Sequence, residues 1–135
     1  MKTKLPAIVL IEMDDVTLDL YRRELSKSFE VLSFNQIDGV LDIITRQNVQ
    51  AVILEPEISS GRGWELISSI NTSFPDHSIP IIVCSTRDTH GERLQGSVTK
   101  YLTKPVLPRD LKEKTLEVVE KRNEIRKHRG RFTGI

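Results

Sequence analysis

The sequence is poor in cysteine, in long apolar runs and in glycine-rich loops. Cys84 is the only cysteine among 135 residues, which excludes a disulfide within the chain and predicts a reducing, cytoplasmic setting. The longest uninterrupted apolar run, residues 7–11, is far shorter than the ~20 residues of a membrane span. Acidic residues follow that run at once, which argues against a signal peptide. With 38% hydrophobic and 29% charged residues, we expect one compact soluble domain.

The charge is divided unevenly along the chain. Residues 120–135 carry six Lys or Arg against two Glu, a net of +4, while residues 1–119 carry 14 basic against 17 acidic residues, a net of −3. A solvated helix end explains this pattern, because cations suit a helix C-terminus. Contact with nucleic acid or another anionic surface is the alternative. We do not expect nucleic-acid binding through the main domain.

Short apolar segments alternate with helical patterns along the chain. The expected strands are residues 7–11, 29–34, 51–54, 80–84 and 98–102. Amphipathic helices are expected between them, with Asp38 opening the second, and a last helix is expected from Pro108 to His128. The alternation predicts an α/β fold in which a parallel sheet is joined by right-handed crossovers.

Polar residues follow several of the expected strands. In an open parallel sheet, ligands gather beyond the C-terminal strand ends. Carboxylates there suit Mg²⁺, and a lysine with a hydroxyl suits a phosphoryl group. The other interpretation is that Lys104 only neutralises buried carboxylates. The residues in question are Glu12, Met13, Asp14, Glu55, Ser85, Thr86, Lys104 and Pro105.

Five segments in order and in register resemble one family. Tyr-Leu-Thr-Lys-Pro at 101–105 resembles the last-strand signature of the response-regulator receiver domain, a component of two-component and phosphorelay signalling. Residues 8–14 resemble its first strand and acidic cluster, and 52–55 resemble the strand that ends in its phosphoryl acceptor. Gly63 matches the glycine that follows the acceptor, and residues 80–86 resemble the fourth strand.

The resemblance implies a fold and a set of site residues. The fold would be flavodoxin-like and doubly wound, with a five-stranded parallel sheet of order 2-1-3-4-5 and five helices. We expect a receiver-like domain at residues 1–122 and a basic helical extension or tail at 123–135. Glu55 would stand at the phosphoryl-acceptor position. The implied acidic pocket is Glu12, Met13 and Asp14, and the implied switch and phosphoryl-contact residues are Ser85, Tyr101, Lys104 and Pro105.

The sequence also departs from the family pattern. Glu55 replaces the acceptor aspartate, and Met13 stands where the family has its main metal-ligating aspartate. A thioether is a poor ligand for Mg²⁺. A register slipped by one residue would restore an acidic pair, but it would place Glu12 inside the first strand. The segment between Ser85 and Lys104 is short for the family, so the fourth helix is expected to be short or irregular.

These departures favour a pseudo-receiver. We expect it to act by protein–protein contact, independently of phosphorylation, and not as an enzyme beyond residual autophosphorylation and autodephosphorylation. The alternative is a working Mg²⁺-dependent receiver. The absence of a glycine-rich phosphate loop argues against a nucleotide or flavin binder. No cofactor is expected, with Mg²⁺ at most weakly bound by Glu12, Asp14 and Glu55. The expected partner is a histidine kinase or another signalling protein, and a homodimer is possible.

Overall fold

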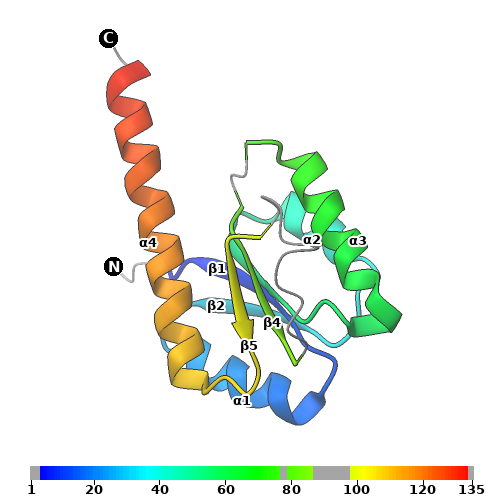
Figure 1. Cartoon of the computed structure of the whole chain (residues 1–135). Helices are drawn as coiled ribbons and strands as arrows, with labels where there is room; N and C mark the ends of the chain where they lie inside the picture. The colour runs from blue at the N-terminus through cyan, green and yellow to red at the C-terminus, as the bar shows by residue number, and fades with distance from the viewer. Residues whose placement is uncertain (1–3, 77–78, 87–97, 134–135) are drawn as a thin grey trace.

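A parallel sheet lies between two layers of helices (Figure 1). The computed structural model describes residues 4–76, 79–86 and 98–133. The five strands lie in the order β2-β1-β3-β4-β5, as expected. Their bounds are β1 Ala7–Ile11, β2 Glu30–Phe34, β3 Val49–Leu54, β4 Ile81–Ser85 and β5 Lys100–Thr103. The helices are α1 Asp15–Leu25, α2 Val40–Arg46, α3 Ile58–Ser73 and α4 Pro108–Thr133.

The strands are apolar on both sides because both faces of the sheet are covered. Val9 and Ile11 face the core beneath α2 and α3, whereas Ile8 and Leu10 face the core beneath α1 and α4. All four side chains are at most 1% exposed. An uninterrupted apolar run is the pattern of a parallel strand buried on both faces.

The C-terminal helix is longer than expected. α4 contains 26 residues and therefore spans ~39 Å; the sequence pattern had placed its end at His128. Its first half packs on the body, where Lys112 pairs with Glu24 of α1 at 2.7 Å. Its second half extends past the sheet (Figure 1). The expected domain end at residue 122 falls inside this continuous helix.

The bounds of several elements differ from the expected ones, and one expected helix is not tested. Gly39, not Asp38, is the N-cap of α2, with a left-handed φ of 82° and no side-chain capping bond. β5 begins at Lys100, although the backbone N–H of Thr99 already donates to Ile81 of β4 at 2.8 Å. The helix expected between β4 and β5 falls at residues 87–97, outside the described residues. In the described ranges, no helix is long and apolar enough to cross a membrane.

The β3–α3 connection is tightly constrained. Ser59, Ser60 and Gly61 have φ values of 51°, 60° and 89°, which places three successive residues in the left-handed region. Gly63 then lies directly against the backbone of Pro56. A Cβ on Gly63 would be 2.6 Å from both the Cα and the carbonyl oxygen of Pro56. This close approach fixes the chain immediately after Glu55.

Candidate functional site

Two buried glutamates lie side by side at the C-terminal edge of the sheet. β1 and β3 are neighbours with Ile11 opposite Leu54, so the next residues, Glu12 and Glu55, leave the sheet together. The backbone N–H of Glu55 donates to the carbonyl oxygen of Ile11 at 3.0 Å. Glu12 is 2% exposed and Glu55 is 4% exposed. Buried carboxylates require charge partners, and the residue that directly follows β5 supplies one.

The partner is Lys104, which lies between the two carboxylates. Its Nζ donates a hydrogen bond to Oε1 of Glu12 and lies 3.2 Å from Oε2 of Glu55. The Lys104 backbone N–H donates to the carbonyl oxygen of Ser85 at 2.8 Å, which fixes the lysine beside the end of β4. Burial alone would lower the pKa of the Lys104 ammonium, but the hydrogen bonds and charges of Glu12 and Glu55 raise it above its ordinary value. The lysine is therefore charged at neutral pH.

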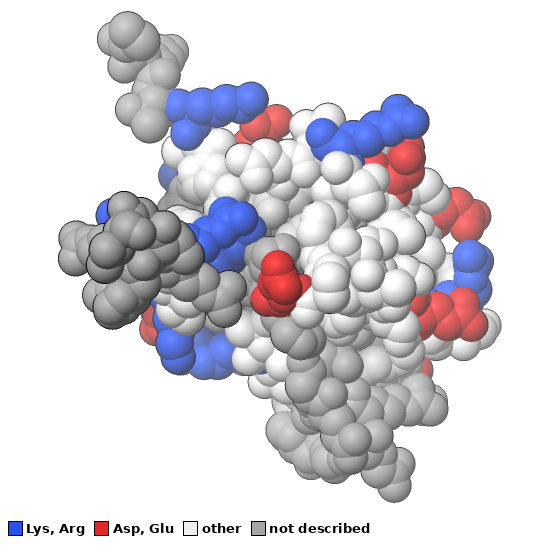
Figure 2. Space-filling model, turned by 90° about the horizontal axis from the view of Figure 1, so that it is seen from above, with Lys and Arg blue, Asp and Glu red and all other residues white. Residues whose placement is uncertain are grey.

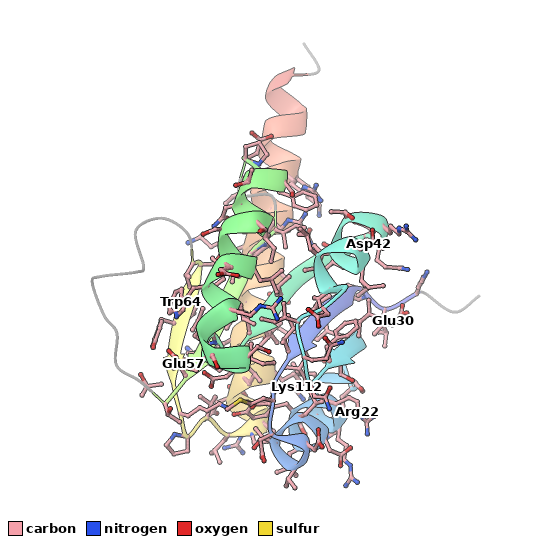
Figure 3. The ribbon with its side chains drawn as sticks, turned by 90° about the vertical axis from the view of Figure 1, so that its right-hand side faces the viewer. Arg22, Glu30, Asp42, Glu57, Trp64 and Lys112 are labelled. Carbon is pink, nitrogen blue, oxygen red and sulfur yellow. The ribbon has the colours of Figure 1, made fainter. Side chains whose placement is uncertain are left out.

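All four carboxylate oxygens of this pair have a donor. The backbone N–H of Asp14 donates to Oε2 of Glu12 at 3.1 Å. The backbone N–H of Glu57, at the start of α3 (Figure 3), donates to Oε1 of Glu55 at 3.2 Å. Lys104 occupies the remaining two oxygens. We call Glu12, Glu55 and Lys104 the carboxylate–lysine cluster. A metal ion or phosphoryl group would have to compete with these donors.

The other two residues of the expected acidic pocket have different surroundings. Asp14 is the N-cap of α1, and its Oδ2 accepts hydrogen bonds from the backbone N–H of Thr17 at 3.0 Å and from the Thr17 hydroxyl at 2.5 Å. These bonds lower the pKa of the Asp14 carboxyl. Met13 is 57% exposed. Among the described residues, no group of three or more His, Cys, Asp or Glu is placed to hold a metal ion.

The expected switch residues lie at the ends of β4 and β5. Ser85 is fully buried and opposite Thr103 in the parallel register. Tyr101 is half-buried and packs against the core beneath α2 and α3, as does Trp64 of α3 (Figure 3). Pro105 follows Lys104 through a cis peptide bond. The fold therefore brings Ser85 and Lys104 to the edge where Glu55 lies.

An exposed apolar patch borders the cluster, and the sequence analysis did not single it out. Val16 and Leu20 are four residues apart on α1 and share its outer face. Leu107 follows Val106, whose carbonyl oxygen accepts a hydrogen bond from the Tyr21 hydroxyl of α1 at 3.2 Å. Four of the six exposed large apolar residues in the described chain lie on α1 or come from segments next to it, and we call them the α1 patch: Met13, Val16, Leu20 and Leu107. The four-residue spacing of Val16 and Leu20 on an otherwise polar helix face is the sequence pattern that could have indicated this patch.

Comparisons with known proteins point to one family. A family model described as the response regulator receiver domain matches residues 8–116. No curated protein matches the chain. A CheY-like receiver domain protein from Methanospirillum hungatei JF-1 is 22% identical, with a TM-score of 0.80 over 90% of this chain and 98% of that one. A structure described as adenylate cyclase from Rhodopirellula baltica is 18% identical, with a TM-score of 0.83 over 97% of this chain and 99% of that one.

Proposed function

Because this chain belongs to the response-regulator receiver family of two-component signalling, we propose that it is a pseudo-receiver, which signals in the cytoplasm by protein contact and without phosphorylation. Residues 1–122 would form the receiver unit and residues 123–135 its basic extension. At most, residual autophosphorylation and autodephosphorylation would remain.

The observation that carries this proposal is the position of Lys104. In a working receiver the lysine reaches the phosphoryl group on the acceptor, as the family resemblance implies. Here its ammonium group is already held by Glu12 and Glu55. The longer Glu55 side chain thus supplies, without phosphorylation, a negative charge for Lys104. A carboxylate carries less charge than a phosphoryl group of about −1.5 to −2, so this imitation of the activated contact is partial.

The acceptor chemistry also disfavours phosphorylation. Glu55 extends the carboxylate by one methylene relative to aspartate, and a misplacement of about 1 Å can cost about 100-fold in rate. Both Glu55 oxygens already have donors, from Lys104 and the backbone of Glu57. To attack a phosphoryl group, a Glu55 oxygen would have to break its interaction with Lys104 or with the backbone N–H of Glu57, and that donor would then be unpaired in a buried site.

The α1 patch supports signalling through protein contact. Exposed apolar residues that gather in one place commonly mark an interaction site. Met13 follows Glu12 directly, so a partner on the patch would also contact the edge of the carboxylate–lysine cluster. We propose a histidine kinase or another signalling protein as this partner, and a second copy of the chain is the alternative.

Incubation with acetyl phosphate and Mg²⁺ is expected to leave the mass of the protein unchanged. The reason is that Glu55 replaces the acceptor and Met13 replaces a metal ligand. Intact-mass spectrometry measures the result, and the double variant Glu55→Asp/Met13→Asp is the matched gain-of-function control. Met13 is exposed, so its replacement should leave the fold intact. A gain of one phosphoryl group on Glu55 of the unmodified chain would contradict the proposal and favour a working Mg²⁺-dependent receiver.

Mg²⁺ is expected to bind weakly, without saturation at millimolar concentrations. Glu12 and Glu55 share Lys104, and Asp14 is engaged by Thr17. Mg²⁺ prefers carboxylate oxygens in octahedral geometry, which these donors do not leave free. Trp64 is the only tryptophan, so its fluorescence can follow the titration, with calorimetry as a second measurement. Saturable sub-millimolar binding that Asp14→Asn abolishes would show that Asp14 is a ligand and that the slipped register is correct.

A further inference from the structure

A polar pocket lies at the opposite end of the sheet from the carboxylate–lysine cluster. It has a volume of about 630 Å³ and lies between α4 and the first residues of β5. Figure 2 looks onto this end of the molecule from above, where basic side chains border α4. We call it the α4–β5 pocket. The proposed signalling function does not use it.

The pocket collects more positive than negative charge. Its four cationic side chains come from two elements far apart in the sequence: Lys100 of β5, and Lys121, Arg122 and Arg126 of α4. Asp76 and Glu117 are its acidic residues, so four cations meet two carboxylates. In the part of the chain that the structure describes, none of the four cations forms an ion pair with either carboxylate. Glu117 pairs instead with Lys114 at 3.8 Å, so the lining of the pocket carries more cations than carboxylates.

Arg122 contributes an unused donor. Its Nη1 donates to the side-chain oxygen of Gln50 at 3.0 Å, which ties α4 to the start of β3. Its Nε is buried and has no hydrogen-bond partner among the described residues. An unpaired buried donor costs free energy until a partner arrives. Burial and the nearby charge of Arg126 both lower the pKa of the Arg122 guanidinium, and an anion near both side chains would offset these two effects by its attraction for the cations.

The pocket also has an apolar wall. Pro80, Val118 and Ile125 line it, and Ile125 is 47% exposed. A ligand that matches both features has several negative charges and one flat or apolar part. Guanidinium and ammonium groups form strong hydrogen bonds with phosphate oxygens.

We propose that the α4–β5 pocket binds a small organic polyphosphate, such as a nucleoside triphosphate. Its phosphates would contact the cations of α4, and its base would lie against Val118 and Ile125. Such a site needs no glycine-rich loop, because side chains supply the donors that a phosphate loop takes from its backbone. Because the pocket lies at the opposite end of the sheet, it would give the domain an input that does not pass through Glu55.

The test is calorimetric titration of the full chain with ATP, ADP, AMP and inorganic tripolyphosphate in 150 mM KCl without divalent cations. We expect saturable binding of ATP, with affinity falling at each loss of a phosphate. Tripolyphosphate should bind more weakly than ATP, because it cannot contact the apolar wall. Arg126→Gln and Lys121→Gln should each weaken ATP binding about tenfold, since a charge-assisted contact is lost in each.

Lys127→Gln is the matched control. Lys127 is an exposed cation on the same helix and does not line the pocket. Its loss should change the affinity by no more than about twofold, because Lys127 lies outside the pocket and would act on the bound anion only at a longer distance, where salt screens the interaction. Ile125→Ser should weaken the binding of ATP but not the binding of tripolyphosphate, because only ATP has a base that contacts the apolar wall. The substituted side chains at 121, 125 and 126 are exposed, so these variants should fold, as circular dichroism can verify.

Two results would overturn the proposal. One is the absence of saturable binding of any of the four compounds at low millimolar concentration. The other is equal weakening by Lys127→Gln and Arg126→Gln, together with displacement of ATP by duplex DNA. That pattern would show that α4 is a general basic surface for nucleic acid rather than the wall of a ligand pocket.

Discussion

Replacement of Lys104 by Met is expected to destabilise the domain by about 3–5 kcal/mol, because it leaves buried carboxylates without their charge partner. Glu12 and Glu55 are each less than 5% exposed, and Lys104 is the cation that contacts both. At 4 Å and an effective dielectric of about 20, one such attraction is roughly 4 kcal/mol before desolvation. Urea unfolding of the two proteins measures the loss.

A double-mutant cycle separates the two contacts of Lys104. Glu55→Gln in the Lys104→Met background should restore part of the stability, and Glu12→Gln should restore more, because Glu12 makes the closer contact. Arg46→Met is the matched control: Arg46 pairs with Asp42 at 3.2 Å on the surface, with side chains 74% and 58% exposed. The free energy of unfolding should fall by at most about 1 kcal/mol in Arg46→Met. Zero coupling between Lys104 and Glu55 would remove the physical basis of the pseudo-receiver proposal.

Replacement of Gly63 by Ala is expected to destabilise the domain by about 2–3 kcal/mol, the cost of overpacking a site that cannot yield. In a helix without tertiary contacts the same change would stabilise by up to about 1 kcal/mol, so the sign of the effect is diagnostic. The new Cβ would lie 2.6 Å from the Pro56 backbone, which cannot rotate away as a side chain can. Thermal and urea unfolding measure the change.

Gly61→Ala is the control for Gly63→Ala. Its Cβ would meet nothing within 4 Å, but its φ of 89° is left-handed. The expected cost is therefore about 1–2 kcal/mol from backbone strain alone. Because Pro56 directly follows Glu55, Gly63→Ala should also disturb the carboxylate–lysine cluster. A stabilised Gly63→Ala protein would mean that the close approach to Pro56 does not exist in solution.

The carboxylate–lysine cluster was the part of the site that the sequence came nearest to predicting. Parallel strands end at one edge, so residues that directly follow apolar runs must gather there. That rule placed Glu12, Glu55 and Lys104 at one edge, and one interpretation was that Lys104 neutralises buried carboxylates there. The structure shows that contact, with Lys104 Nζ 3.2 Å from Oε2 of Glu55. It adds that Lys104 is held more closely by Glu12, because Lys104 lies between both strand ends.

The sequence by itself determined the class of the fold, and the strand order was implied by its resemblance to the receiver family. The uninterrupted apolar runs required strands covered on both faces, and the structure has the strand order that the resemblance implied. The tertiary structure alone decided that Asp14 serves α1 through Thr17, that Gly63 lies against Pro56, and that Lys100 meets the α4 cations. The physical reason is that apolar periodicity depends on residues that are near one another along the chain. The contacts just named depend instead on side-chain and backbone packing at distances of a few ångströms, which the sequence pattern does not specify.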